Sequence, residues 1–331
     1  MSNEHSRRKF LAASMTGAGL AALGATDTVQ AAETSTMPLR PLGKTGRMIS
    51  IVGFGGGSRY NLQDNEAEAE QMIHRAVELG INYFDTAHSY TLGEHRLSMQ
   101  RYGKWLTPNY RNQITLSTKL QARDAEGAKK QFDECLTDLK TDHVDILHFH
   151  GVGSTEEVDQ IIAKDGALKM YRKWQEEGVI KYIGVTNHDN GDVLVDAMKR
   201  IKPDVVMCPQ NPGHGSGNQN GVDFAGKVIP YALAHGIGMM GMKITAQNKL
   251  IGKGGITAEE LVRYALTLPV AAMIIGMPTL EVVESNAHIA RTLKPMTEQE
   301  RLAAQKKLMA VDMRKTAPYL AAGYVDGQTH A

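Results

Sequence analysis

The feature that most constrains the fold is a repeated alternation of short apolar runs with longer amphipathic stretches. The runs are rich in Val, Ile, Leu, Met, Tyr and Phe and show little polar alternation, which is typical of parallel strands buried on both faces. After a hairpin-like lead at residues 39–50, eight of these strand-like runs follow, at residues 51–54, 81–86, 113–118, 144–149, 180–186, 204–208, 238–244 and 270–276.

Helical patterns separate the strand-like runs. They include residues 66–79, 126–139, 159–177, 192–201 and 258–268. Eight strand–helix units within about 250 residues predict a closed (β/α)8 TIM barrel with an N-terminal β-hairpin. A further C-terminal helix is predicted at residues 298–313, followed by a tail at residues 314–331.

The competing fold is an open, doubly wound sheet with a glycine-rich dinucleotide fingerprint after its first strand. Glycines do follow the first run, in the segment Gly53–Gly57. Their spacing is not G-x-G-x-x-G, and the residues that come next do not resemble a helix start. The number of repeats therefore favours the barrel, with a domain over residues 39–313.

Residues 1–31 have a different character from the rest of the chain. Arg7 and Arg8 precede a weakly apolar run at residues 10–25, and small residues at 29–31 offer a cleavage site. This order is typical of a signal peptide, and the paired arginines resemble a twin-arginine (Tat) signal. The run is too short and too rich in glycine for a permanent membrane span. We therefore expect the Tat export machinery as a partner and a periplasmic location.

Composition excludes several classes of protein. The 331-residue chain has 37 basic and 36 acidic side chains and no basic run, which argues against a nucleic-acid partner. Its two cysteines, Cys135 and Cys208, are too few for a disulfide scaffold, a four-thiolate zinc site or an all-cysteine iron–sulfur cluster.

Chemically active side chains follow four consecutive predicted strands. They are Asp85, Lys119, His150 and Asn187, at intervals of 34, 31 and 37 residues, and Tyr90 lies five positions after Asp85. Strands of a parallel barrel all end at the same face, so these residues should converge there. Burying a carboxylate, an ammonium and an imidazole together is costly unless they pair with one another, which indicates a functional site.

The segments around these residues resemble the aldo-keto reductase superfamily. The resemblance runs from about Leu39 to Arg291 in the expected order and spacing. It is carried by Leu42–Gly46, Phe84–Tyr90, Ser117–Lys119, Asp145–His150, Ile183–Asn187 and the stretch from Ile275 through Asn286.

The resemblance implies an NAD(P)H-dependent oxidoreductase that reduces the carbonyl of a small aldehyde or ketone to an alcohol. Tyr90 would be the general acid, and Lys119, held by Asp85, would favour its phenolate by lowering a pKa that is ordinarily about 10. His150 would orient the carbonyl oxygen. A different reading stays open: a barrel that holds a nucleotide and acts as a binding or sensing protein without turnover.

The resemblance also assigns cofactor contacts. Thr186 and Asn187 would hold the nicotinamide carboxamide, Lys243 would contact the pyrophosphate, and Asn286 would lie at the adenosine. NADP(H) is expected over NAD(H), although NAD(H) stays open because several positions depart from the family pattern. The departures are Met207, Gln210, Gly276, Val282 and Ser285.

Five histidines could lie near the same face of the barrel. The alternatives are a metal site and a polar hydrogen-bond network below the active site. We favour the network and expect no metal. The histidines are His88, His148, His150, His188 and His214.

Overall fold

The computed structural model describes residues 36–214, 222–321 and 324–327. All of these residues belong to one unit, Ser35–Ala331. The predicted signal peptide at residues 1–31 lies outside the described residues. Within those residues, every helix is too short or too polar to cross a lipid bilayer.

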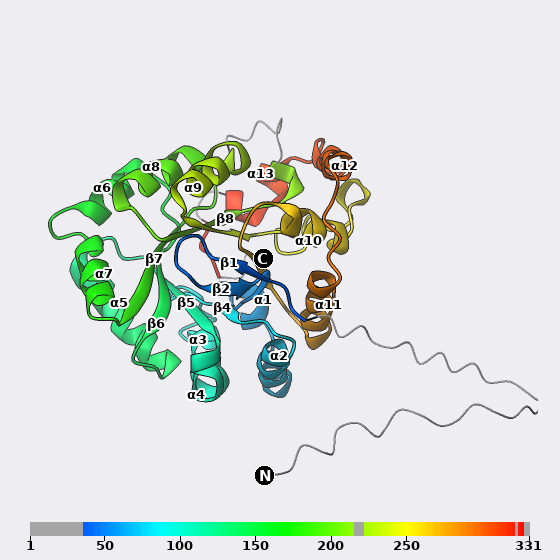
Figure 1. Ribbon diagram of the computed structural model, residues 1–331. Helices are drawn as coiled ribbons and strands as arrows, with labels where there is room; N and C mark the ends of the chain where they lie inside the picture. The colour runs from blue at the N-terminus through cyan, green and yellow to red at the C-terminus, as the bar shows by residue number, and fades with distance from the viewer. Residues whose placement is uncertain (1–35, 215–221, 322–323, 328–331) are drawn as a thin grey trace, which may run out of the picture. The chain divides into compact units, whose positions relative to one another are not determined.

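Eight parallel strands close into a barrel, as predicted (Figure 1). The closure is made where the last strand pairs with the first, with Ile274 opposite Gly53. The strands at residues 144–149 and 180–186 match their predicted bounds, and the others differ by one or two residues at an end. The strands are β3 (Val52–Gly55), β4 (Tyr83–Asp85), β5 (Thr115–Leu120), β6 (Val144–Phe149), β7 (Ile180–Thr186), β8 (Val205–Pro209), β9 (Gly238–Met242) and β10 (Ala272–Gly276).

A β-hairpin fills the end of the barrel where the strands begin. It consists of β1 (Leu39–Pro41) and β2 (Met48–Ser50), which pair antiparallel. Leu42 and Ile49 are fully buried and belong to an apolar cluster inside the barrel. Gly43 has a φ of +55°, and a Cβ there would lie 2.4 Å from the backbone nitrogen of Gly238. Only glycine allows this close approach, so the hairpin is fixed against β9.

Helices cover the outside of the barrel, and their ends are set by polar caps. Asn65 accepts from the backbone of Ala67 and Glu68 at the start of α2, and Thr257 forms a capping box with Glu260 at the start of α10. The longer helices are α2 (Glu66–Glu78), α5 (Ala125–Leu139), α6 (Thr155–Ile162), α7 (Ala167–Glu176), α8 (Gly191–Ile201), α10 (Ala258–Thr267), α11 (Leu280–Arg291) and α12 (Glu298–Leu308).

Several short helical segments lie in the loops between these elements. The α-helical ones are α1 (Ser58–Asn61), α3 (Leu97–Arg101), α4 (Thr107–Tyr110), α9 (Ile229–His235) and α13 (Met313–Thr316). Two π-helical turns span Tyr102–Leu106 and Phe224–Val228, and 3-10 turns span Arg111–Gln113, Pro212–His214, Lys253–Gly255 and Pro318–Leu320.

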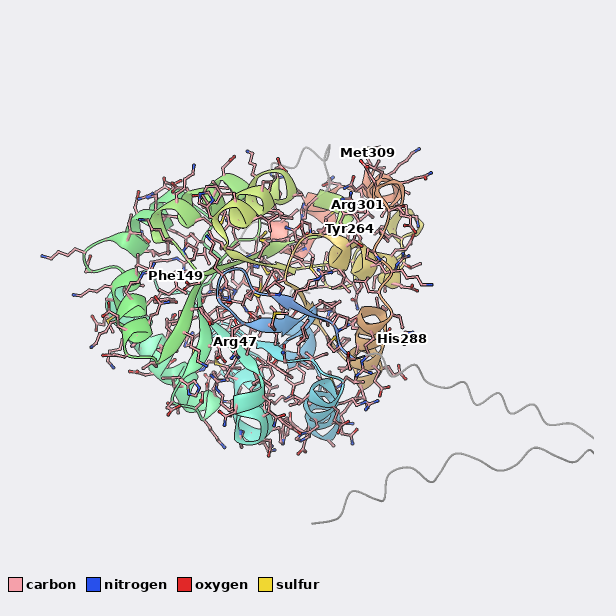
Figure 2. All side chains as sticks on the ribbon, in the orientation of Figure 1. Arg47, Phe149, Tyr264, His288, Arg301 and Met309 are labelled. Carbon is pink, nitrogen blue, oxygen red and sulfur yellow. The ribbon has the colours of Figure 1, made fainter. Side chains whose placement is uncertain are left out.

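Aromatic side chains pack the helices onto the strands. Phe149 of β6, labelled in Figure 2, stacks on Tyr171 of α7 with ring centroids 3.9 Å apart. The hydroxyl of Tyr171 donates to the backbone oxygen of His148 at 3.0 Å. The strand that carries His148 and leads to His150 is therefore fixed from outside as well as from its neighbours.

Two predicted helices are each divided. The helix predicted at residues 159–177 is divided into α6 and α7. Between them the backbone of Gly166 packs against the end of α6, and a Cβ at Gly166 would lie 2.4 Å from the backbone oxygens of Gln160 and Ile161. The chain turns tightly there, and a periodic apolar pattern does not reveal the turn. The helix predicted at residues 298–313 ends at Leu308, and Asp312 caps α13 separately.

Candidate active site

The polar residues predicted at the strand ends meet at one face of the barrel. Asp85 is the last residue of β4, Lys119 lies in β5 and His150 directly follows β6. The register places Lys119 beside His148 and Asp85 beside Ser117. Parallel pairing therefore brings together side chains that are about one strand–helix unit apart in the sequence.

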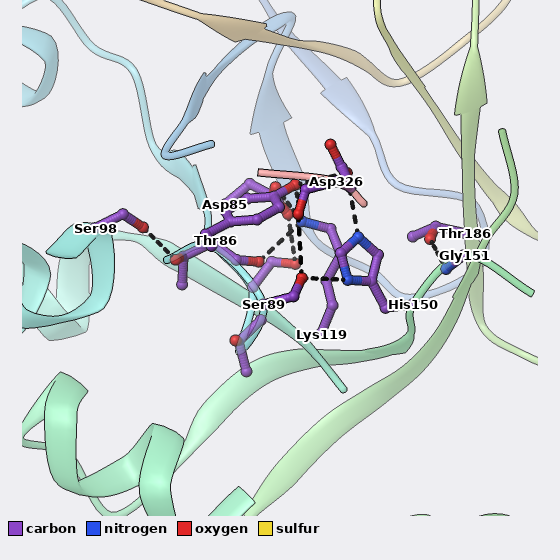
Figure 3. Close-up of polar contacts among 12 residues, drawn as sticks. Asp85, Thr86, Ser89, Ser98, Lys119, His150, Gly151, Thr186 and Asp326 are labelled. Atoms are coloured by element: carbon purple, nitrogen blue, oxygen red, sulfur yellow. Dashed lines mark hydrogen bonds and ion pairs between the residues drawn. The ribbon is translucent and has the colours of Figure 1, made fainter. Parts of the chain in front are cut away.

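Lys119 is the centre of this group (Figure 3). Its side chain is completely buried, and its ammonium forms an ion pair with Asp85. The ammonium also donates to the backbone oxygen of Thr86 at 2.9 Å and to the hydroxyl of Tyr90 at 3.1 Å. Ser117 donates to the other carboxylate oxygen of Asp85 at 3.1 Å. The predicted phenol, ammonium and carboxylate are thus in direct contact.

His150 lies next to Tyr90. The two rings meet edge to face, with centroids 5.7 Å apart. Burial lowers the pKa of His150 to about 4, so the imidazole is neutral near pH 7. Its Nδ1 lies 3.1 Å from the Ser89 hydroxyl, and its Nε2 lies 3.1 Å from a carboxylate oxygen of Asp326. Because a carboxylate only accepts, the proton is on Nε2 and Ser89 donates to Nδ1.

Asp326 is the principal residue that the sequence did not predict. One of its carboxylate oxygens accepts from Tyr90 at 3.1 Å and from His150 at 3.1 Å. The other forms an ion pair with Lys243 and accepts from Tyr324 at 2.8 Å. Burial would raise the pKa of Asp326, but the Lys243 ammonium and the imidazoles of His150 and His188 outweigh it and hold that pKa well below its usual range.

This carboxylate changes the expected electrostatics of Tyr90. The sequence predicts that Lys119 lowers the pKa of the phenol. In the structure, burial and the negative charges of Asp326 and Asp85 raise the pKa of Tyr90 well above its ordinary value. Tyr90 is therefore held as a protonated hydrogen-bond donor while Asp326 is in place.

The five histidines do not form one cluster. His150 and His188 both approach Asp326, at 3.1 Å and 3.3 Å. His88 instead contacts Glu134 at 2.7 Å, and His214 contacts the hydroxyl of Tyr319 at 2.7 Å. The remaining one, His148, is buried with both ring nitrogens unpaired. Over the described ranges, no set of three or more His, Cys, Asp or Glu side chains is arranged to hold a metal ion.

The residues expected at the nicotinamide already form hydrogen bonds within the protein. Thr186 accepts from the backbone nitrogen of Gly151 at 2.8 Å, and the Asn187 amide donates to the backbone oxygen of Val152 at 2.5 Å. The Asn187 side-chain oxygen caps the start of the following loop by accepting from Asn190 at 2.8 Å. Their contact with a cofactor stays a prediction.

A cavity opens beside Tyr90 and has features that fit a phosphate-bearing cofactor. Its lining includes the cations of Arg59 and Lys243 and the glycines Gly55 and Gly276. The Arg59 Nε is buried without a hydrogen-bond partner, although its Nη2 donates to the backbone of Gln247. Two cations and an unused donor suit an anionic group. Arg59 was not predicted, because it lies in α1, outside the family motifs, where the sequence did not indicate the start of a helix.

The absence of a side chain at Gly276 makes room for Arg59. A Cβ at Gly276 would lie 3.1 Å from the Cγ of Arg59. Asn286 does not line this cavity. It lies in a groove between α10 and α11, where its buried side-chain nitrogen has no hydrogen-bond partner.

Comparisons with known proteins agree with this geometry. A model of the aldo/keto reductase family matches residues 52–260. L-galactose dehydrogenase from Arabidopsis thaliana is 31% identical over 231 residues, which span 65% of this chain and 68% of that protein. D-threo-aldose 1-dehydrogenase from a Pseudomonas species is 27% identical over 49% of this chain and 57% of its own length.

A solved structure shows the same fold. The aldo-keto reductase from Bacillus halodurans superposes with a TM-score of 0.64 and 24% identity, over 82% of this chain and 96% of its own. The family match covers all of the strands from β3 to β9, including those that carry Asp85, Lys119 and His150. The chain belongs to the aldo/keto reductase family.

Proposed function

We propose that this chain is an NAD(P)H-dependent oxidoreductase that reduces the carbonyl of a small aldehyde or ketone to an alcohol. The observation that carries the proposal is the contact of 3.1 Å between the Tyr90 hydroxyl and the Lys119 ammonium, with Asp85 paired to that ammonium. A phenol, a buried cation and its counter-ion in contact form an acid whose anion can be stabilised.

Each side chain has a distinct part in the reaction. The nicotinamide, when bound, supplies the hydride. Tyr90 donates a hydrogen bond and then a proton to the carbonyl oxygen, and Lys119 stabilises the phenolate that is left. Asp85 keeps the ammonium charged and in place. The neutral imidazole of His150 donates from Nε2 to the same oxygen and fixes its direction.

The cofactor proposed is NADP(H) in preference to NAD(H). Arg59 and Lys243 line one cavity and offer two cations to phosphate groups. Arg59 lies against Gly276, where NADP-specific relatives tend to carry their own cation, so it can supply the charge that Gly276 lacks. Thr186, Asn187 and Asn286 are proposed contacts on the family pattern.

We also propose that the chain is exported by the Tat route and works in the periplasm. The proposal is supported by Arg7 and Arg8 ahead of an apolar run. Cell fractionation tests this location, with the full-length chain compared to a variant in which both arginines are changed to lysine. Export of the first and retention of the second are expected.

The catalytic proposal is tested by turnover. The purified chain is mixed with NADPH or NADH and a panel of small aldehydes and ketones, and the loss of reduced nicotinamide is followed. Tyr90→Phe is expected to lower kcat by about 10²- to 10⁴-fold while the nucleotide still binds. Tyr231→Phe, which changes a half-buried ring on α9, is the matched control.

A nucleotide that binds the wild-type chain without reducing any carbonyl would contradict the proposal and favour the binding or sensing function. Activity that survives in Tyr90→Phe would contradict the role of Tyr90 alone.

A further inference from the structure

We propose that the C-terminal segment Tyr324–Gly327 is a built-in ligand of the active site, and that its Asp326 carboxylate occupies the position of the substrate's carbonyl oxygen until the segment is displaced. The inference rests on the proposed function, because that function defines which oxygen Tyr90 and His150 bind. The ligand class is a carboxylate, supplied here by the chain itself.

The first carboxylate oxygen lies where the reaction needs the carbonyl oxygen. Oδ2 of Asp326 is 3.1 Å from the Tyr90 hydroxyl and 3.1 Å from the His150 Nε2 (Figure 3). Both distances are those of ordinary hydrogen bonds. A substrate oxygen that accepted from these two donors would have to overlap with Oδ2. The carboxylate therefore lies in the substrate position, and not beside it as a participating acid or base would.

The second carboxylate oxygen anchors the segment. Oδ1 forms an ion pair with Lys243, which also contacts the Tyr324 hydroxyl at 2.7 Å. The Lys243 ammonium lies 5.0 Å from the centroid of the Tyr324 ring, and His188 meets the same ring edge to face. Asp326 is 7% exposed. A carboxylate this deeply buried is tolerated because charged and polar partners surround it on several loops.

The backbone of the segment is fitted to the site as well. Gly327 has a φ of +88°, and a Cβ there would lie 2.0 Å from the Cδ1 atom of the Tyr90 ring. The backbone oxygen of Asp326 lies 3.3 Å from the Ser89 hydroxyl. Any other residue at 327 would collide with Tyr90 and strain the backbone. The segment thus packs on the catalytic phenol through a position that only glycine can occupy.

The docked segment prevents turnover in two ways. The cavity that remains beside Tyr90, Lys243 and Asp326 measures about 80 Å³. A cavity that takes up a benzene-sized ring measures about 150 Å³, so a nicotinamide ring does not fit in this cavity while the segment is docked. Burial, and after it the Asp326 charge, also raises the pKa of Tyr90 and holds its proton. Displacement of the segment opens the cavity, removes this negative charge and releases Lys243 for an anionic group.

The test uses the full-length chain and three variants. Asp326→Ala removes the carboxylate, and Gly327→Ala disturbs docking without changing charge. Asp64→Asn, an exposed carboxylate elsewhere, is the matched control. We measure kcat/KM for a carbonyl that the wild type reduces and the Kd of NADPH by calorimetry. A capped peptide Tyr-Val-Asp-Gly, and the same peptide with Asn for Asp, are titrated into Asp326→Ala.

We expect Asp326→Ala and Gly327→Ala each to tighten NADPH binding or raise kcat/KM by about tenfold or more. If the segment is docked in about 90% of wild-type molecules, only about 10% can bind a ligand at the site, which weakens the apparent affinity about tenfold. The Asp peptide should bind Asp326→Ala and compete with substrate, and the Asn peptide should bind more weakly. If both variants match Asp64→Asn, or if Asp326→Ala lowers kcat/KM, the inference is overturned. If no form turns over a carbonyl, the proposed function fails, and the NADPH and peptide affinities still decide whether the segment is a ligand.

Discussion

The ion pair between Asp85 and Lys119 makes a quantitative prediction about stability. The Lys119 side chain is completely buried and that of Asp85 is 4% exposed. Asp85→Asn keeps the shape of the side chain and the hydrogen bond from Ser117, but it leaves the ammonium with only neutral partners, Thr86 and Tyr90. Removal of one partner from a buried pair costs about 3–5 kcal/mol. We therefore expect the free energy of unfolding to fall by that amount.

The double variant Asp85→Asn/Lys119→Met separates this effect from simple loss of packing. It removes both charges and leaves no uncompensated ion, so we expect it to be more stable than Asp85→Asn alone. Urea unfolding followed by circular dichroism measures the four members of the cycle, and the surface change Asp64→Asn should stay within about 0.5 kcal/mol of wild type. In thermal scans, Asp85→Asn should lower the Tm by about 6–10 °C.

Two results would refute the reasoning about this pair. One is a cost below about 1 kcal/mol for Asp85→Asn, which would mean that water reaches Lys119. The other is additivity, in which the double variant loses the sum of the two single losses, because the two charges would then be independent.

Two further predictions concern packing and pH. A Cβ at Gly184 would lie 2.1 Å from Nδ1 of the buried His148. Gly184→Ala should therefore lower the free energy of unfolding, measured by urea titration, by about 1–3 kcal/mol or more. Gly153→Ala is the control and should be near neutral, because the nearest atom to a Cβ there is 3.6 Å away. Burial lowers the pKa of His214 to about 4. Between about pH 6.5 and pH 4, the unfolded chain therefore binds a proton at His214 that the folded chain does not bind. As the pH is lowered through this window, His214 should reduce the free energy of unfolding by about 1.4 kcal/mol per pH unit. The free energy of unfolding of His214→Gln should therefore decrease less steeply than that of the wild type over this window, and the slopes of the two should agree above pH 7. Equal slopes below pH 6.5 would contradict the assignment.

Patterns that repeat along the sequence predicted the barrel and the polar side chains that meet where its strands end. The strand ends at Asp85, Lys119 and His150 recur at intervals of one strand–helix unit, and parallel pairing converts such intervals into proximity. Tyr90 follows from its short distance to Asp85. These inferences need only local periodicity and the direction of the strands.

The failures have a common physical origin in contacts between distant parts of the chain. Asp326 meets Tyr90 and His150 across 236 and 176 residues, and a lone acid near a C-terminus carries no periodic signal. The predicted lowering of the Tyr90 pKa was wrong because burial raises that pKa, and the charge of the distant Asp326 raises it further. The division between α6 and α7 depends on how closely Gly166 approaches the backbone of the preceding helix, which composition does not reveal.

The hairpin at the start of the barrel has a consequence for how the acid is restored after each cycle. Leu42 and Ile49 fill the end of the barrel where the strands begin. They belong to an apolar cluster that extends to Met207 and Met242, which line the cavity beside Tyr90. Among the described residues, these side chains fill the barrel between the hairpin and the cavity that Tyr90 lines. Under the proposed function, the proton that Tyr90 gives away therefore returns from the face where the strands end, which is also the face where the alcohol departs.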